Sequence, residues 1–300
     1  MTNTTTTNSI TKFDAWMMAA RPRTLPAALV PVLVGSSIAV QDGKFKPLAA
    51  IIALICALLI QIGTNFVNDL YDFLHGTDKK DRVGPKRVVT AGLISITEIK
   101  IGIIAVFVLS FVFGMYLVYI TGWEVLLLGV VSILAGIAYT AGPFPLAYNG
   151  LGDIASFLFF GLVGTIGTYY VQAGEVSAFA FWSSIPVGAL ITNILVVNNY
   201  RDREEDQLNG KNTLAVLLGV KFARFQYVVF MLVSYAILLV VYFTYKNSVW
   251  VFLPMLSLPL SVKLVKMVFT LQGSELNKTL ELTAKLSALY GLLFAAGILI

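Results

Sequence analysis

The sequence predicts an all-α polytopic membrane protein with about nine transmembrane helices. Composition is the first reason, because 58% of the 300 residues are hydrophobic, only 12% are charged, and the mean hydropathy is +0.83. A soluble core of this size does not need such an apolar surplus, whereas a chain that crosses a bilayer many times does. The other two reasons are a series of long apolar segments and a one-sided distribution of Lys and Arg.

Each apolar segment has close to the ~20 residues that a helix needs to cross the hydrocarbon core. In chain order the segments span 24–40, 48–70, 99–120, 123–141, 151–172, 180–199, 222–245, 249–270 and 283–300. Several contain Gly or Pro, which membrane helices tolerate where neighbouring helices pack closely.

The chain begins with a polar stretch, MTNTTTTNSITK, whose composition is typical of disorder. We expect a disordered polar tail over residues 1–20 and a single transmembrane domain over residues 21–300. The stretch lacks the charged-then-apolar order of a cleaved signal peptide, so we expect the first helix to insert uncleaved.

Lysine and arginine predict the orientation, because positive residues concentrate in cytoplasmic loops. Only three of the 21 basic residues fall on one side of the predicted helices, namely Lys44, Lys46 and Lys246. We therefore place the N-terminus in the cytoplasm, the C-terminus outside, and the chain in the plasma membrane. The net charge of +5 follows from this orientation, and we expect no nucleic-acid partner.

Half of the 16 acidic residues fall in two stretches, 65–87 and 198–213, each following an apolar segment on the predicted cytoplasmic side. In the first stretch four polar residues recur at the spacing of one helix face: Asn65, Asn68, Asp69 and Asp72. In the second, Asp202 and Asp206 are one helical turn apart. The offset of about 130 residues suggests an internal repeat. A chance coincidence of Asn and Asp at helix ends is the alternative.

Carboxylates stacked in this way repel one another unless a cation lies between them. Oxygen ligands without a Cys or His cluster favour magnesium, which completes its shell with water and substrate phosphates. The expected ligands of Mg²⁺ are Asn68, Asp69, Asp72, Asp202 and Asp206. The alternative is a solvated loop in which these acids pair with nearby Lys and Arg.

Basic residues in the same two stretches suit a diphosphate. Arg82, Arg87 and Lys211 lie in turn-like sequence (RVGPKR and LNGKNT), as expected for a loop folded over the site. Arg201 directly precedes Asp202. Acids that bind magnesium beside bases that bind phosphate indicate a diphosphate site. The alternative is that these bases only follow the orientation rule.

Outside the two stretches, Asp153 opens an apolar segment with no basic residue nearby, and an ionisable group at that depth is a site candidate. A helix cap is the alternative. Tyr139 and Tyr148 could line a cavity and stabilise a cation through their ring faces, or simply pack. His75, the only histidine, we interpret as a bystander. The sequence contains no Ser-His-Asp set, P-loop or dinucleotide fingerprint.

At the two acidic stretches the chain resembles the intramembrane aromatic prenyltransferases of the UbiA-type superfamily. The first motif reads NDLYDFLHG and matches the family pattern at Asn68, Asp69 and Asp72, with Gly76 where a last aspartate often stands. Asp78 is the candidate replacement. The resemblance implies nine helices in a bundle around a central cavity, capped by cytoplasmic loops, with prenyl diphosphate held through Mg²⁺.

Four longer stretches are similar to the branch of this superfamily that prenylates 1,4-dihydroxy-2-naphthoate in menaquinone synthesis. They are ARPRTLPAALVPVLVG, DRVGPKRVVTAGLIS, YTAGPFPLAYNGLGD and NNYRDREEDQLNGKNTLAV. This resemblance implies transfer of a polyprenyl group from its diphosphate to the naphthoate ring, with loss of carbon dioxide and diphosphate, to give demethylmenaquinone.

The resemblance also implies roles for individual residues. Asn68, Asp72, Asp202 and Asp206 would act at the catalytic centre through magnesium, while Asp69 would serve either the metal or the loop fold. Arg23 and Asp153 would orient the acceptor.

Two kinds of alternative stay open on the sequence alone. The near one is a member of the same superfamily that uses another acceptor, such as 4-hydroxybenzoate, homogentisate or haem. The distant ones are a divalent-cation transporter, which the clustering of acids at one face disfavours, and a CDP-alcohol phosphatidyltransferase, whose signature the chain lacks.

Overall fold

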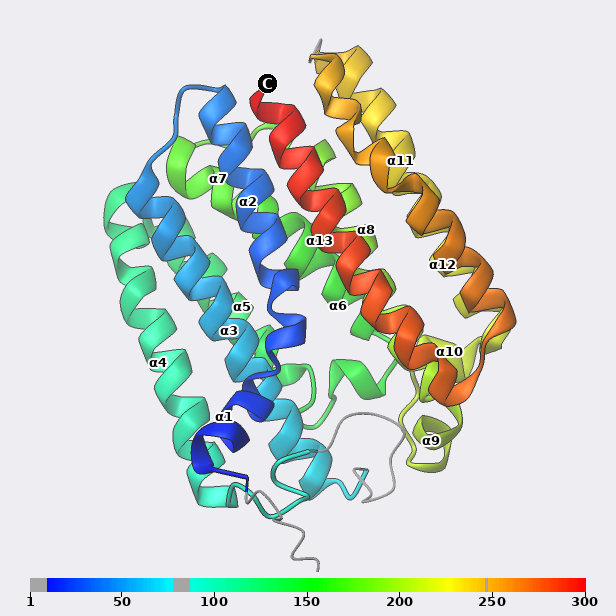
Figure 1. Cartoon of the computed structure of the whole chain (residues 1–300). Helices are drawn as coiled ribbons and strands as arrows, with labels where there is room; N and C mark the ends of the chain where they lie inside the picture. The colour runs from blue at the N-terminus through cyan, green and yellow to red at the C-terminus, as the bar shows by residue number, and fades with distance from the viewer. Residues whose placement is uncertain (1–9, 78–86, 246–247) are drawn as a thin grey trace, which may run out of the picture.

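A computed structural model describes residues 10–77, 87–245 and 248–300, and the regular structure in this part of the chain is entirely helical (Figure 1). The elements follow one another as α1 (Lys12–Ala20), η1 (Pro22–Thr24), α2 (Pro26–Gln41), α3 (Pro47–Leu74), α4 (Ile96–Thr121), α5 (Trp123–Ala138), η2 (Leu146–Tyr148), α6 (Gly152–Ser156), η3 (Phe157–Val163), α7 (Gly164–Ala173), α8 (Ala178–Arg201), α9 (Arg203–Leu208), α10 (Leu214–Leu217), α11 (Gly219–Tyr245), η4 (Val249–Ser257), α12 (Leu258–Thr270), η5 (Gly273–Glu275) and α13 (Leu276–Leu299).

Each of the nine predicted segments coincides with helical structure. Within the described ranges, seven helical segments are long and apolar enough to cross a membrane, and an eighth results if the pair Lys12–Thr24 and Pro26–Gln41, bent by 50°, counts as one span. The ninth, α5, is apolar but has only 16 residues. The prediction of an all-α polytopic membrane protein is confirmed.

The N-terminal region differs from the disordered tail predicted to reach residue 20. Lys12–Ala20 forms α1, which begins with a capping box. The Thr11 hydroxyl accepts a hydrogen bond from the Asp14 amide, and the Asp14 carboxylate accepts one from the Thr11 amide. Ala15 and Ala19 are buried in a cluster that includes Phe66 of α3. The prediction of disorder is therefore wrong for residues 12–20, because the cap at Thr11 starts a helix there. Residues 1–9 lie outside the described part, and the single-domain assignment of 21–300 stays a prediction.

The helix α8 is the most enclosed span and packs against α11, α13 and η3. The outer helix α4, which packs mainly on α3, leaves large apolar side chains exposed, including Ile101, Ile104 and Val112. Such a surface suits hydrocarbon and not water. The C-terminal end of α13 lies at the opposite end of the bundle from α1 and α9 (Figure 1).

One span departs from regular α-helix at its closest contact with α8. The seven residues Phe157–Val163 form a π-helical turn, and a Cβ placed on Gly161 would lie 2.7 Å from the Cα of Gly188. In the other direction, a Cβ on Gly188 would lie 3.0 Å from the carbonyl oxygen of Phe157. Small residues let membrane helices approach until their backbones touch. Glycine at both positions therefore sets the distance between this span and α8.

We expect Gly161→Ala to destabilise the protein by about 1–3 kcal/mol, because the added methyl group must push two backbones apart. Thermal unfolding in detergent would measure the loss. Gly129→Ala in α5 is the matched control, since a Cβ there meets nothing within 4 Å and alanine favours the helix by up to about 1 kcal/mol. Equal stability of the two variants would contradict this account of the contact.

Candidate active site

A cavity of about 1670 Å³ lies inside the bundle and is lined by residues of α2, α3, α4, α5, η3, α7, α8 and α13. Polar and charged side chains gather near Asp72, at the C-terminal end of α3. Farther along α3 the wall becomes mostly apolar and reaches Ala53. These residues are 19 positions apart, so the cavity follows the helix for about 28 Å. A long apolar space with one charged end suits a ligand that has a lipid tail and an anionic head.

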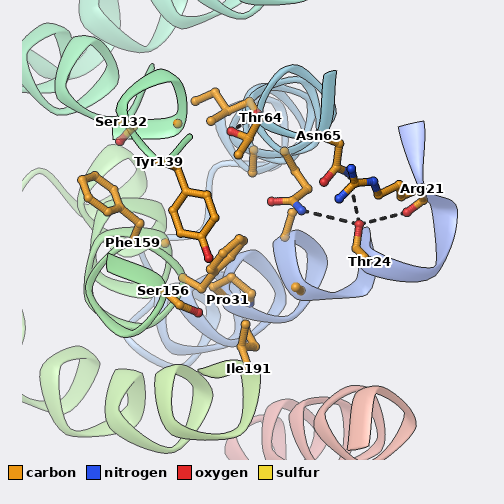
Figure 2. A pocket seen from close by; sticks show the side chains of 18 of the residues that line it. Arg21, Thr24, Pro31, Thr64, Asn65, Ser132, Tyr139, Ser156, Phe159 and Ile191 are labelled. Carbon is orange, nitrogen blue, oxygen red and sulfur yellow. Dashed lines mark hydrogen bonds between the residues drawn. The ribbon is translucent and has the colours of Figure 1, made fainter. Parts of the chain in front are cut away.

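The first acidic motif lies on the inner face of α3, as its spacing predicted. Asn65, Asp69 and Asp72 are all buried. The Asn65 amide group donates hydrogen bonds to the carbonyl oxygen of Ala20 at 3.0 Å and to the Thr24 hydroxyl at 3.2 Å. Asn65 therefore fixes the end of α1 and η1, which lead into α2, against α3, on the cavity wall shown in Figure 2.

Two arginines neutralise the carboxylates of this motif. Arg87 bridges them, with one nitrogen 2.8 Å from Asp69 Oδ1 and another 3.0 Å from Asp72 Oδ2. Arg21 also contacts Asp69 Oδ1, at 2.6 Å, and the Val88 amide donates to its Oδ2. Asp69 is thus saturated by partners from the flanking segments. Of the two possible roles for Asp69, the geometry favours anchoring the loop.

The remaining contacts of the motif come from the segment after α5. The Tyr148 hydroxyl donates to Asp72 Oδ1 at 2.8 Å and also lies 2.9 Å from the Thr77 hydroxyl oxygen. The Thr140 hydroxyl donates to the Asn68 side-chain oxygen. Tyr148 therefore lies at the acidic end of the site, where the side chain of Lys211 also stands over its ring.

The second motif follows the end of α8. Arg201 donates one hydrogen bond to each carboxylate oxygen of its neighbour Asp202, both at 2.7 Å. It also donates to the side-chain oxygens of Asn198 and Asn277. The helix breaks at Asp202, but the Asp206 amide still donates to the Asp202 carbonyl oxygen at 2.8 Å. The two carboxylates therefore remain one turn apart, as predicted.

The two motifs meet across a small polar cleft. Its lining residues come from both stretches: Asp72, Thr77, Arg87, Asp202, Glu205, Asp206, Asn209 and Lys211. The Asn209 side chain donates to the Thr77 carbonyl oxygen at 3.2 Å, a direct link between segments 132 residues apart. Segments that the sequence placed on the same side of the membrane are thus in contact.

Asp206 differs from the other carboxylates of this cleft. Its Oδ1 lies 3.5 Å from Lys211 Nζ, while its buried Oδ2 has no hydrogen-bond partner among the described residues. Burial raises the pKa of Asp206 to about 6, against the opposing effect of Lys211, and Asp202 and Asp72 raise it further. A buried acceptor oxygen without a donor suits a cation.

Within the described ranges, no three His, Cys, Asp or Glu side chains converge closely enough to hold a metal ion as they stand. Two of these carboxylates are instead paired with arginines, Asp72 with Arg87 and Asp202 with Arg201. The donors still suit magnesium, since oxygen groups of both motifs line one cleft.

The predicted acceptor residues fall in different places. Tyr139 and Arg23 line the cavity, and Figure 2 shows the Tyr139 ring pointing into it, with Thr64 and Asn65 on the facing wall. Asp153 does not line the cavity, because its two oxygens accept hydrogen bonds from Asn199 at 3.1 Å and Gln226 at 3.0 Å. The geometry gives Asp153 a packing role between helices instead of direct contact with a ligand.

Among the predicted diphosphate residues, Arg87, Arg201 and Lys211 lie at the polar end of the cavity, whereas Arg82 and Asp78 fall outside the described residues. Sequence reasoning missed Arg21 as a site residue. Its backbone is left-handed, with φ of 52°, in the turn between α1 and η1. This turn directs the side chain to Asp69, and no local pattern in the sequence signals it.

We compared the chain with protein families, with characterised proteins and with solved structures. Residues 28–289 match the UbiA prenyltransferase family. The chain is 37% identical over 300 residues to the 1,4-dihydroxy-2-naphthoate octaprenyltransferase of Escherichia coli strain K12, covering 98% of this chain and 97% of that protein. It is 32% identical over 288 residues to the protein of the same name from Bacillus subtilis strain 168, covering 95% and 92%.

Among solved structures, a UbiA homolog from Archaeoglobus fulgidus bound to GPP and Mg²⁺ superposes with a TM-score of 0.67 at 17% identity, covering 95% of this chain and all of that one. At this identity the likeness establishes the fold. The near full-length sequence matches establish the family, and the chain belongs to the UbiA prenyltransferase family.

Proposed function

We propose that this protein transfers a polyprenyl group from a polyprenyl diphosphate to 1,4-dihydroxy-2-naphthoate. The observation that carries the proposal is the meeting of the two acidic motifs at the charged end of a long apolar cavity. The relatives named above support the acceptor, because they are 1,4-dihydroxy-2-naphthoate octaprenyltransferases that match nearly the whole chain. The archaeal structure bound to GPP and Mg²⁺ supports the donor and the metal.

The bond changes balance without an external oxidant. The allylic carbon–oxygen bond of the donor breaks, and the electron pair leaves with the diphosphate. A new carbon–carbon bond forms at the ring carbon that carries the carboxylate. Loss of that carboxylate as carbon dioxide returns its electron pair to the ring and restores aromaticity. The product is demethylmenaquinone in its hydroquinone form.

Magnesium would be held by Asp72, Asp202 and Asp206, which line the small cleft, and by Asn68 on the adjoining wall of the larger cavity. The unpartnered Asp206 oxygen is the feature that suits it most directly. When bound, the ion supplies positive charge that neutralises the leaving diphosphate.

The basic residues at the polar end bind the diphosphate and stabilise its departing oxygens. Arg87, Arg201 and Lys211 lie there already, and Arg82 is proposed to join them. Arg87 and Arg201 hold carboxylates in this structure. The guanidinium groups of Arg87 and Arg201 would be available to phosphate oxygens if a cation replaced them on these carboxylates.

The body of the cavity keeps water from the reacting carbon and holds the tail. Tyr139 and Phe159 present aromatic rings to this space (Figure 2). Their faces stabilise positive charge that develops on the allylic carbon. The electron-rich acceptor ring then needs orientation more than it needs a strong base.

We further propose that the acidic end faces the cytoplasm and that the protein resides in the plasma membrane. The distribution of Lys and Arg supports this orientation. In this orientation the C-terminal end of α13 lies on the outer side, because it is at the opposite end of the bundle from α9 (Figure 1).

Asp72→Asn and Asp202→Asn should each lower prenyl transfer by at least about 100-fold, because each removes a negative charge from the proposed metal site while keeping the shape of the side chain. The assay would follow prenylated product and released carbon dioxide in detergent, with magnesium present. Glu175→Gln, an exposed acid that pairs with Lys44 away from the cavity, should leave the rate unchanged. Near-normal rates in both aspartate variants would contradict the metal assignment.

The acceptor assignment predicts that 1,4-dihydroxy-2-naphthoate is turned over well and 4-hydroxybenzoate and homogentisate poorly, with the same polyprenyl diphosphate. A panel of these acceptors with purified protein would measure the ratio of kcat/KM values. Preferred turnover of a phenolic acceptor would retain the prenyltransferase reaction and reject the naphthoate.

Asp206→Asn should raise the Tm of the magnesium-free protein near about pH 7.5, and the gain should shrink steadily as the pH falls toward 3.8. The folded protein raises the pKa of Asp206 from 3.8 to about 6. Ionisation is therefore disfavoured in the folded state, and stability falls as the pH rises through this interval. The neutral side chain removes a penalty of about 1–3 kcal/mol.

Magnesium should stabilise the wild type and have a smaller effect on this variant. Thermal unfolding in detergent with EDTA or Mg²⁺ measures both effects. The same magnesium response in both proteins would argue against Asp206 as a ligand.

A further inference from the structure

The wall of the cavity carries a second group of charges that the transfer of the prenyl group does not use. On α13, Lys278 and Lys285 line the cavity together with Glu281, and Arg23 of η1 lines it as well. Lys285 lies nine positions beyond the start of α13, about 14 Å into an apolar span. A charged side chain at such a position is costly against lipid and therefore marks a functional site.

These charges form one cluster with an excess of cations. Lys285 Nζ lies 2.6 Å from the Glu281 carboxylate, one turn away, and both side chains are largely exposed. Lys278 lies three positions before Glu281, on the same face of α13, and Arg23 lines the same cavity. Three cations against one acid leave a local excess of positive charge, which one further anionic group would reduce.

The cluster adjoins the acidic site from two directions. Arg23 is two residues from Arg21, which contacts Asp69 at 2.6 Å. Lys278 directly follows Asn277, whose side-chain oxygen accepts a hydrogen bond from Arg201 at 2.8 Å. An anion held by the cluster therefore lies beside the end of the cavity where the donor's diphosphate is proposed to bind.

We propose that Arg23, Lys278 and Lys285 form a binding site for the carboxylate of the aromatic acceptor. The proposal rests on the function proposed above and adds the residues that recognise this substrate. A planar aromatic acid can keep its charge on these cations while its ring enters the apolar cavity beside Tyr139.

The reaction then removes the carboxylate by which the acceptor is bound. Once the ring carbon is prenylated, the carboxylate leaves as carbon dioxide, and the cluster holds nothing of the product. A neutral hydroquinone with a long tail has no charge left to bind there, so the product can move into lipid. The site therefore favours the acceptor over the product without any conformational change.

The test measures binding of 1-hydroxy-2-naphthoate, which carries the carboxylate, and of 1-naphthol, which lacks it, to protein in neutral detergent. The double variant Lys278→Gln and Lys285→Gln should weaken binding of the acid by about tenfold or more and leave binding of the naphthol unchanged. The control pair, Lys263→Gln and Lys266→Gln on α12, removes the same charge from residues that do not line the cavity. It should bind the acid like the wild type.

Kinetics separate this proposal from the proposed function. In the α13 double variant the KM for the naphthoate acceptor should rise about tenfold, while kcat and the KM for the polyprenyl diphosphate stay close to those of the wild type. Equal loss of acid and naphthol binding, or no loss of either, would overturn the carboxylate site even if prenyl transfer is intact.

Restored acid binding in Lys278→Arg with Lys285→Arg would support a requirement for charge. Suppression of acid binding by phosphatidylglycerol vesicles, with no difference between acid and naphthol in neutral detergent, would assign the cluster to a lipid headgroup and overturn the proposal.

Discussion

Ion pairs between buried carboxylates and arginines hold the charged end of this protein together. Asp69 and Asp72 lie on one face of α3, where their charges would repel, and Arg87 bridges them from the segment beyond the loop. Arg201, the last residue of α8, pairs with the carboxylate of its neighbour Asp202. Removing one partner from such a pair leaves a buried charge uncompensated, which costs several kcal/mol. The segment that begins at Arg87 is therefore tied to α3 by the same carboxylates that are proposed to act in the reaction.

The rest of the architecture follows from keeping this charged end separate from an apolar interior. The span Gly152–Ala173 comes close enough to α8 for Gly161 and Gly188 to touch, and the second acidic motif begins directly after α8, the most enclosed helix. Exposed apolar side chains on α4 meet hydrocarbon outside the bundle. A long cavity with one polar end remains between these walls. The sites proposed for donor and acceptor share that end.

The local features of this fold could be predicted from the sequence. Apolar segments of about 20 residues predicted the helices, and a helical period of 3.6 residues predicted that Asn65, Asp69 and Asp72 share a face. Contacts between distant segments could not be predicted in this way. Nothing near Arg21 indicates its left-handed backbone or its contact with Asp69, 48 positions away. The partners of Asp153 are also distant in sequence. Its place at the start of an apolar segment predicted a ligand site, whereas Asn199 and Gln226 account for both of its oxygens.

The hydrogen bonds of the site also bear on how the protein is made. Tyr148 and Asp72 are 76 positions apart, Asn209 and Thr77 are 132 apart, and Arg201 reaches Asn277 at the start of the last helix. Contacts of such long range form late, because long loops must close first. A chain still leaving the ribosome therefore carries its aspartates into the membrane before most of these partners exist. The hydrogen bond from Arg201 to Asn277 can form only after α13 has been made and inserted. Partly synthesised chains that lack α13 therefore cannot assemble the complete site.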